Sequence, residues 1–286
     1  MKKYFITYGN ARFAQSRDRL CRQASSLGFF DVVRGFRGKD LSSIPEWEDA
    51  QKLDEFARLV GERTHVFWKW KPAIIYYMLS EVLSANDVLF YSDGGSTIPT
   101  WNQGSKPKEI SGGYRGLAQY KNGKDHAPHS RQHSLLKFGE YYDAVLSAAS
   151  GALAFEIKDC QINEKDVLEK YWTKPDVFDH FNVKNDKSIT DTLQRAGGML
   201  HVVRKCPFSL ELYKEWWMTA KHYPALFTNE TSFPDFKKRG NCHRHDQSIW
   251  SVLSKMHGTL ISDDWQLCPI LQTRYNITDP IHDTPY

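Results

Sequence analysis

The first residues of the chain carry a pattern that predicts a parallel β-sheet. An apolar run at residues 4–8 ends at a Gly-Asn pair, and apolar residues then recur at helical spacing over 16–27. Gly28 ends this predicted helix, and a second apolar run occupies 29–34. A strand, a helix and a second strand in this order form a β-α-β unit, whose two strands lie parallel in one sheet. The sequence therefore predicts an α/β fold from its start.

Further patterns extend this prediction to a mixed central sheet flanked by helices. Short apolar runs predict strands at 88–91, 151–155 and 198–203. Helical spacing predicts helices at 46–59, 72–83, 171–181, 209–221 and 245–257, the third with Thr173 as its N-cap.

One long segment is expected to be mostly loop. Residues 97–133 are rich in Gly, Pro, Ser, Lys and His, and loops of this length in compact domains are usually functional, such as a lid or an acceptor-binding element. We see no internal repeat and no linker. Residues 1–286 are therefore expected to form one domain, with a core at about 4–257 and a C-terminal tail after about 270.

Composition narrows the class of protein. Of the 286 residues, 41% are hydrophobic and 25% are charged, as in a folded globular domain. The net charge of +4 suits a phosphate-bearing ligand but is too small to indicate a nucleic-acid-binding protein. The five cysteines are widely spaced, which favours reduced thiols in a cytoplasmic protein. No signal peptide and no apolar stretch of about 18 residues is present, so no transmembrane segment is expected.

The motif most informative about function follows the strand predicted at 88–91. Ser92, Asp93, Gly94 and a second glycine come directly after it. The strand would place the Asp93 carboxylate at the edge of the sheet where α/β proteins bind ligands, and the glycines would let a ligand approach the backbone. A single carboxylate there suits a hard divalent cation that bridges phosphate oxygens. The same residues are good turn formers, so a plain β-turn is the alternative.

Aromatic and basic side chains precede the helix predicted at 72–83. Trp68 and Trp70 alternate with Lys69 and Lys71 just before its first turn. The free amides and the dipole of a helix N-terminus attract phosphate, and Lys71 would add a positive charge there. The alternative is that the tryptophans belong to the core and the lysines are solvated.

A second cluster of ligand-type side chains stands at the start of the helix predicted at 245–257. His243 and His245 are of the type that binds transition metals, and Asp246 can be a metal ligand or a general base. Gln247 follows directly. The alternative is that Asp246 only caps the helix.

Two glycines introduce the strand predicted at 198–203. Gly197 and Gly198 would allow close approach by a ligand or by another backbone segment, and a simple bulge is the alternative. Thr173 and Lys174 are interpreted as a helix cap and a surface charge.

Six short motifs occur in one order over roughly residues 4–257. They are Thr7-Tyr8-Gly9-Asn10 with the helix at 16–27 and Gly28-Phe29-Phe30-Asp31; Trp68-Lys69-Trp70-Lys71-Pro72; Tyr91-Ser92-Asp93-Gly94-Gly95; Tyr171-Trp172-Thr173-Lys174-Pro175-Asp176-Val177-Phe178; Gln194-Arg195-Ala196-Gly197-Gly198; and His243-Arg244-His245-Asp246-Gln247-Ser248. Together they resemble a family of GT-A-fold glycosyltransferases from large DNA viruses, bacteria and eukaryotic microbes. The family includes the amino-terminal glycosyltransferase domain of a chlorella-virus multidomain protein.

The resemblance implies a reaction and a set of roles. It implies a GT-A-like fold, a UDP- or GDP-sugar donor, a divalent metal such as Mn²⁺ or Mg²⁺, and a glycan or glycoconjugate acceptor whose hydroxyl receives the sugar. Asp246 would deprotonate the acceptor if the enzyme inverts configuration, and Gln247 would matter if it retains configuration. The donor site would be formed by Thr7, Tyr8, Gly9 and Asn10 at the base and ribose, with Trp70, Lys71, Ser92, Asp93, Gly94, Gly197 and Gly198.

The chain departs from the family at one position. Gly95 stands where a complete Asp-x-Asp motif has its second acid. Asp93 alone leaves a divalent ion short of protein ligands, so His243 or His245 is expected to contribute to the metal site.

Two other functions are compatible with these sequence features. A nucleotidyltransferase or another nucleotide-dependent α/β enzyme would need the same phosphate site but would cleave between the α and β phosphates. A non-catalytic carbohydrate-binding module would use the many aromatic side chains as stacking platforms.

Overall fold

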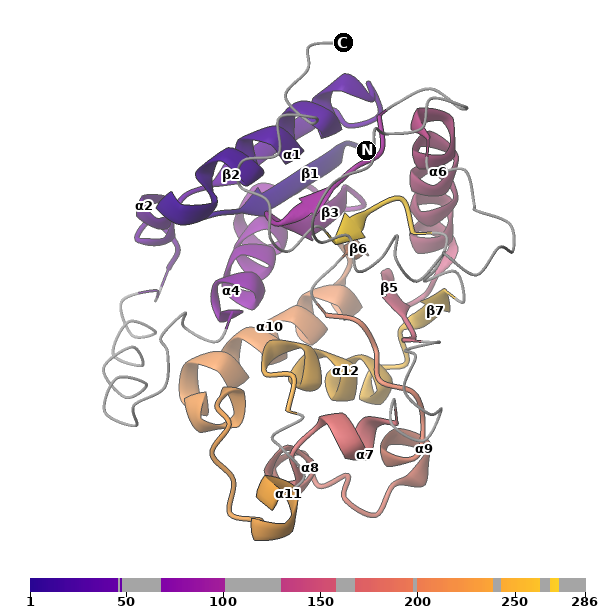
Figure 1. The fold of residues 1–286 in the computed structure, drawn as a ribbon. Helices are drawn as coiled ribbons and strands as arrows, with labels where there is room; N and C mark the ends of the chain where they lie inside the picture. Colours follow the sequence, from indigo (N-terminus) through magenta and orange to yellow (C-terminus); the bar gives the residue numbers. More distant parts are fainter. Residues whose placement is uncertain are drawn as a thin grey trace, which may run out of the picture.

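The computed structural model describes residues 1–45, 47, 68–100, 130–157, 168–197, 200–238, 243–262 and 268–272. A central sheet is flanked by helices, which confirms the predicted mixed α/β class (Figure 1). Most of the helix expected at 46–59, most of the loop expected at 97–133, and the C-terminal tail lie outside the described residues. The single-domain organisation of the whole chain stays a prediction.

The main sheet combines parallel and antiparallel pairing. In the described residues its strand order is β2-β1-β3-β6-β5-β7. β1 is parallel to both β2 and β3, β6 is antiparallel to β3 and β5, and β7 is parallel to β5. Strands β4 and β8 form a separate antiparallel pair. The strands are β1 (Lys3–Tyr8), β2 (Val32–Phe36), β3 (Val88–Asp93), β4 (Ser96–Thr97), β5 (Ala152–Phe155), β6 (His201–Arg204), β7 (Leu260–Ser262) and β8 (Leu271–Gln272).

Helices of varied length connect these strands. The α-helices are α1 (Ala14–Ser26), α2 (Gly38–Leu41), α4 (Trp70–Tyr77), α6 (Arg131–Ser147), α7 (Glu169–Trp172), α8 (Pro175–His180), α9 (Lys187–Thr190), α10 (Pro207–His222), α11 (Pro234–Lys238) and α12 (Asp246–Met256). Short 3₁₀ segments are η1 (Ala11–Phe13) and η6 (Pro224–Phe227), and α4 continues into the π-helical turn η3 (Met78–Val82).

The predicted β-α-β unit is present, with its second strand shifted toward the C-terminus. Gly28 ends α1 with a φ of 68°, a conformation that suits glycine. β2 then begins at Val32, paired with Tyr4 of β1. The Asp31 side chain accepts a hydrogen bond from the Lys3 backbone amide and the Asp31 amide donates to the Lys3 carbonyl, so Asp31 fixes the start of the pairing.

Alternate side chains of the strands face two cores. Ile6, Leu89 and Tyr91 pack with α4, α10 and α12 on one face of the sheet. Phe5 and Phe90, their neighbours in the strands, pack with α1 and α6 on the other face. This alternation follows from the period of two in a β-strand, and it explains why the central strands are apolar throughout.

The sequence interpretation missed helix α6. Its first turn falls in the stretch expected to be loop, yet Ser130 caps it by accepting a hydrogen bond from the His133 amide at 3.2 Å. Phe138, Tyr141 and Val145 recur on its buried face. The polar residues around them hid this pattern.

The prediction of a single helix at 171–181 was also wrong. Two short helices, α7 and α8, replace it, and Thr173 is the C-cap of the first instead of the N-cap of the second. The physical reason is Pro175, because the residue before a proline is restricted to extended backbone, and Lys174 has φ −66° and ψ 146°.

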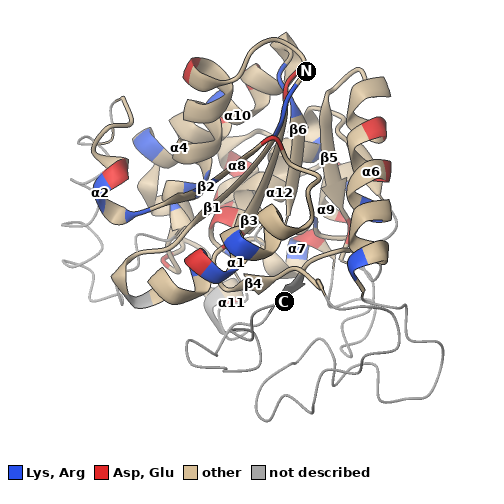
Figure 2. Cartoon of the chain, turned by 90° about the horizontal axis from the view of Figure 1, so that it is seen from above, with Lys and Arg blue, Asp and Glu red and all other residues tan. Residues whose placement is uncertain are grey.

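Charged residues of both signs are mixed on the outer helices. Figure 2 shows Lys or Arg beside Asp or Glu on α1, α2 and α6, which agrees with the small net charge. Within the parts of the chain that the structure describes, none of the helices combines the length and the apolar character that a membrane crossing requires.

A core substitution in α6 tests this packing. Phe138 is fully buried, and its ring lies 5.1 Å from that of Phe30 and 5.6 Å from that of Phe90. We expect Phe138→Ala to lower the free energy of unfolding by about 3–5 kcal/mol in urea denaturation. Leu136→Ala on the exposed face of the same helix should change it by less than about 0.5 kcal/mol. Equal effects would contradict the placement of α6.

Candidate active site

The candidate site lies where the strand order changes direction. β2 and β3 flank β1 on opposite sides, and all three are parallel. Tyr8 and Asp93, the last residues of β1 and β3, are register partners at the carboxyl edge of the sheet. Open α/β sheets bind their ligands in the crevice at such a topological switch point. Asp93 therefore stands at the end of its strand, as the sequence predicted.

Four segments bring a lysine, two carboxylates and a backbone carbonyl together at this edge. The Lys71 Nζ atom, in the first turn of α4, lies 2.5 Å from Asp246 Oδ2 at the start of α12. The same atom lies 2.9 Å from the Gly197 carbonyl oxygen and 3.4 Å from Asp93 Oδ1. The structure thus gathers Lys71, Asp93, Gly197 and Asp246, which the sequence analysis selected separately. We call Lys71, Asp93 and Asp246 the charged cluster.

The charged cluster is strongly coupled because most of it is buried. Lys71 and Asp246 are buried, whereas the Asp93 side chain is 30% exposed. Burial raises the pKa of Asp246 to about 6, against the opposing effect of Lys71. Burial opposes the charge of Lys71, yet Asp246 and Asp93 raise its pKa above the usual value. Two carboxylates share one ammonium, so the cluster carries one net negative charge when both acids are ionised.

Polar side chains from the core orient this cluster. The Tyr91 hydroxyl donates to Asp93 Oδ1 at 2.9 Å. His201 Nε2 donates to the Gly197 carbonyl at 2.9 Å, and its Nδ1 then accepts from the Tyr213 hydroxyl at 3.1 Å. Burial, together with Lys71, lowers the pKa of His201 to about 3, so this ring is neutral. His201 was missed because a lone histidine in a predicted strand carries no distinctive signal.

The residues at the ends of β1 and β3 are tightly packed. A Cβ atom on Gly94 would lie 2.4 Å from the Tyr8 carbonyl oxygen, so the loop after Asp93 crosses β1 where only glycine fits. Thr7 and Ser92 are fully buried there. Thr7 Oγ1 is enclosed there and has no hydrogen-bond partner among the described residues.

Tyr8, Gly9 and Asn10 complete the first motif and pack beside the ends of β1 and β3. The Tyr8 ring packs against the Trp70 ring at 4.9 Å. Gly9 is enclosed, because a Cβ atom there would lie 2.9 Å from Arg17 Cβ, and its carbonyl accepts from Arg17 Nη1 at 2.8 Å. Asn10 begins the turn that leads into η1, since its carbonyl accepts from the Phe13 amide.

Gln247 also lies at this edge. Its Nε2 atom donates to Gln194 Oε1 at 2.7 Å, and its Oε1 accepts from the Gly197 amide at 3.4 Å. A Cβ atom on Gly197 would lie 2.8 Å from Gln247 Cα, so this glycine permits close approach of α12. Gly198, the second glycine of the motif, lies outside the described residues.

The two histidines expected to bind metal instead bind the backbone of the segment around η6. His243 Nδ1 accepts from the Lys174 amide at 3.3 Å, and its Nε2 donates to the Leu226 carbonyl at 2.8 Å. His245 Nδ1 donates to the Phe227 carbonyl at 2.8 Å, and its ring stacks on Trp68. Burial lowers the pKa of both rings, so both are neutral. Metal binding by His243 would require it to give up one of these hydrogen bonds.

The described residues do not fit the metal site expected from the sequence. Among them, no group of three His, Cys, Asp or Glu side chains is placed to bind one ion. The ammonium group of Lys71 already lies between the carboxylates of Asp93 and Asp246. This part of the chain therefore offers Asp93 as one partly exposed acidic ligand.

Lys174 is buried, so the interpretation of a surface charge was wrong. Its Nζ atom donates to the carbonyl oxygens of Ala225, Thr228 and Glu230 at 2.6, 2.9 and 2.6 Å. Three carbonyl acceptors satisfy the three N–H groups of an ammonium. Lys174 thereby fixes the segment whose carbonyls bind His243 and His245.

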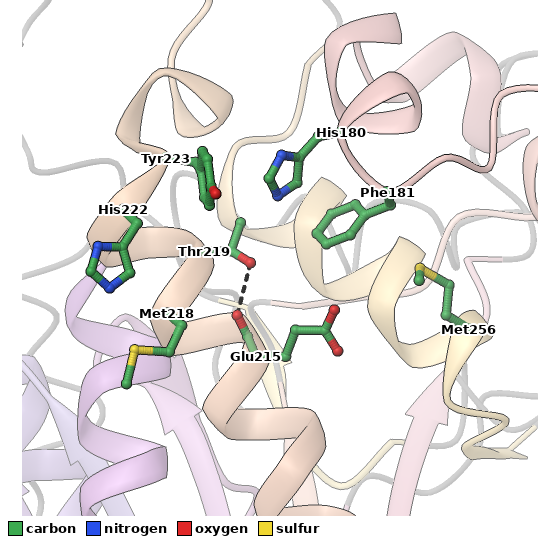
Figure 3. A pocket seen from close by; sticks show the side chains of 8 residues that line it. All are labelled: His180, Phe181, Glu215, Met218, Thr219, His222, Tyr223 and Met256. Carbon is green, nitrogen blue, oxygen red and sulfur yellow. Dashed lines mark hydrogen bonds between the residues drawn. The ribbon is translucent and has the colours of Figure 1, made fainter.

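A hollow lies away from the charged cluster. It measures about 370 Å³ and lies between the end of α8, the second half of α10 and the end of α12 (Figure 3). Met256 on its rim is at the opposite end of α12 from Asp246, about 15 Å along the helix. Its lining residues are His180, Phe181, Glu215, Met218, Thr219, His222, Tyr223 and Met256, none of which the sequence analysis assigned to the site.

Comparisons with known proteins add one distant structural likeness. No protein-family model matches the sequence, and no curated protein matches it. The crystal structure of mouse xyloside xylosyltransferase 1 in its apo form is similar to 91% of this chain and 84% of that chain, at 11% identity and a TM-score of 0.37. At this distance the likeness carries no conclusion about function, which we argue from the site.

Removing the ammonium of the cluster should destabilise the protein in a pH-dependent way. Lys71→Met leaves two carboxylates without their buried counterion, which costs on the order of 3–5 kcal/mol in comparable cases. The pKa of Asp246 already lies at about 6, and the variant would raise it further. Protonation below that pKa relieves the repulsion, so urea denaturation should show a larger loss at pH 8 than at pH 5.

The matched control is the double variant Lys71→Met/Asp246→Asn. It should recover part of the stability at pH 8, because one of the two uncompensated charges is gone. A loss in Lys71→Met that is equal at both pH values would contradict the charge coupling.

Proposed function

We propose that the protein is a glycosyltransferase that moves a sugar from a UDP- or GDP-sugar to a hydroxyl group of a glycan or glycoconjugate. The observation that carries this proposal is the convergence of Lys71, Asp93 and Asp246 at the switch point of the sheet. Ion-pairing side chains from distant segments meet there, in the region where α/β folds bind nucleotides.

The chemistry of the charged cluster suits a sugar ring. Carboxylate oxygens accept hydrogen bonds from hydroxyl groups, and the partly exposed Asp93 can contact a sugar in this way. The net negative charge of the cluster would also stabilise positive charge at an anomeric carbon, which is oxocarbenium-like when a glycosidic bond breaks. Beside it, the ring pair Tyr8 and Trp70 suits a nucleoside.

The proposed reaction breaks one bond and forms another at the anomeric carbon. The bond to the diphosphate oxygen breaks with its electron pair leaving on the phosphate, and the acceptor oxygen forms the new glycosidic bond. The acceptor proton passes to Asp246 if configuration inverts. In a retaining reaction the acceptor proton would pass to the leaving diphosphate oxygen, and Gln247, beside Asp246, would contact the reacting sugar. A requirement for Mn²⁺ or Mg²⁺ is kept as a separate proposal, tested by adding and chelating the metal.

The products decide between this function and its rivals. Purified protein is incubated with UDP- and GDP-sugars and a panel of glycan acceptors, with Mn²⁺ or with EDTA, and the products are analysed by mass spectrometry. Release of a nucleoside diphosphate with an acceptor heavier by one sugar supports the proposal. Release of pyrophosphate indicates a nucleotidyltransferase, and saccharide binding without turnover indicates a binding module.

The pH dependence of transfer tests the role of Asp246. A general base must be ionised, and the pKa of Asp246 is raised to about 6. We expect kcat/KM to rise with pH up to about 6 and then to level off, and Asp246→Asn to lower it about 10²–10⁴-fold. Asp143→Asn on the exposed face of α6 should leave it unchanged. Wild-type turnover by Asp246→Asn would limit Asp246 to a structural role.

A further inference from the structure

A buried carboxylate lies behind Gln247, outside the charged cluster. Glu169 in α7 is fully buried and forms an ion pair with Lys255 at 2.6 Å. It also accepts hydrogen bonds from the hydroxyl groups of Thr173 and Ser251. A charged group is seldom buried so completely unless it organises the polar groups around it.

Glu169 and the Trp172 carbonyl together determine which way the amide of Gln194 points. Gln194 Nε2 lies 3.3 Å from Glu169 Oε1 and 3.4 Å from the Trp172 carbonyl oxygen. A carboxylate and a carbonyl only accept hydrogen bonds, so the amide nitrogen of Gln194 must face them. Its oxygen consequently faces the other way, toward Gln247.

Gln194 in turn determines the orientation of Gln247. Because Gln194 Oε1 only accepts, the group 2.7 Å away must be the Gln247 amide nitrogen. The Gln247 oxygen is then directed to the Gly197 amide, and the carbonyl of Gly197 is bound by Lys71 of the charged cluster. A chain of hydrogen bonds thus runs from Glu169 through the side-chain amides of Gln194 and Gln247 to the edge of the candidate site.

We propose that Glu169 and Gln194 are positioning residues that hold Gln247 with its amide oxygen toward the site. The inference rests on the proposed function, because it predicts what Gln247 offers to the substrates of sugar transfer. An oxygen in that place accepts a hydrogen bond, so Gln247 would bind a hydroxyl group of a sugar as an acceptor. A reversed amide would instead present N–H groups to the same hydroxyl and would lose the bond to Gln194.

Two substitutions at position 194 separate this role from simple packing. Gln194→Met fills similar space without hydrogen bonds and should lower kcat for transfer about 10–100-fold at every pH. Gln194→Glu should be pH-dependent, because only a protonated carboxyl can donate to Glu169 while accepting from Gln247. Its kcat relative to wild type should be near one at pH 5 and should fall as pH rises toward 8.

The charged group that contacts position 194, Glu169, supports this sign. Glu169 faces it from α7, and Lys255 of α12 pairs with Glu169. Arg195 is the next residue, and its backbone forms an isolated antiparallel β-bridge with that of Glu156. A second carboxylate beside Glu169 would have a raised pKa and would repel Glu169 when ionised. The pKa of Asp246 lies in the same pH range, and Asp246 is present in every variant. The kcat of each variant is therefore compared as a ratio to the wild-type kcat at the same pH.

Matched controls use the same substitutions at an exposed glutamine. Gln132→Met and Gln132→Glu in α6 change the same groups at an exposed position and should leave kcat and its pH profile unchanged. Wild-type kcat in Gln194→Met, or a Gln194→Glu variant whose ratio to wild type does not vary with pH, would overturn the inference.

A measurement without turnover keeps the inference separate from the proposed function. The side-chain amide signals of Gln247 in a ¹H–¹⁵N NMR spectrum can be assigned by their loss in Gln247→Leu. We expect slow hydrogen exchange at this amide in the wild type and at least tenfold faster exchange in Gln194→Met, with the thermal unfolding midpoint as a check on folding. Equal exchange rates would overturn the inference. Absence of sugar transfer by the wild type would overturn only the proposed function.

Discussion

The arrangement of the candidate site depends on one buried ammonium group. Lys71 lies between Asp93 at the end of β3 and Asp246 at the start of α12, and it also binds the Gly197 carbonyl. Without this cation, two acids that belong to opposite halves of the chain could not remain ionised so close together. The ion pair therefore links the end of β3 to the start of α12, and it keeps α12 at the carboxyl edge where a ligand would bind.

Local sequence patterns predicted the parts of this structure that depend on neighbours in the chain. The β-α-β unit, the strand before Asp93 and helices α10 and α12 follow from apolar periodicity and turn residues, and all are present. The selection of Lys71, Asp93 and Asp246 rested on their places at strand ends and helix starts. Those places converge because parallel strands end at the same edge of a sheet. The convergence of these three side chains was thus accessible from the sequence.

What the sequence did not indicate depends on contacts between distant segments. Lys174 was interpreted as a surface charge, because nothing nearby shows that three carbonyls more than fifty residues away would bind it. His243 was selected as a metal ligand by residue type, whereas the fold places both of its nitrogens against backbone groups. Glu169 and Gln194 acquire their roles only through the packing of α7 against α12. Burial of a polar side chain is a property of the fold, which residue type alone does not predict.

The three hydrogen bonds of Lys174 restrict which residue can stand at position 174. An ammonium directs its three N–H groups tetrahedrally, and each of them has its own carbonyl acceptor here. An arginine would keep the charge, but its planar guanidinium directs its donors into one plane and could not reach the same three oxygens. Position 174 is thus defined by geometry rather than by charge. In a chain that lost this lysine, the segment after α10 would need a different anchor before His243 and His245 could stay in place.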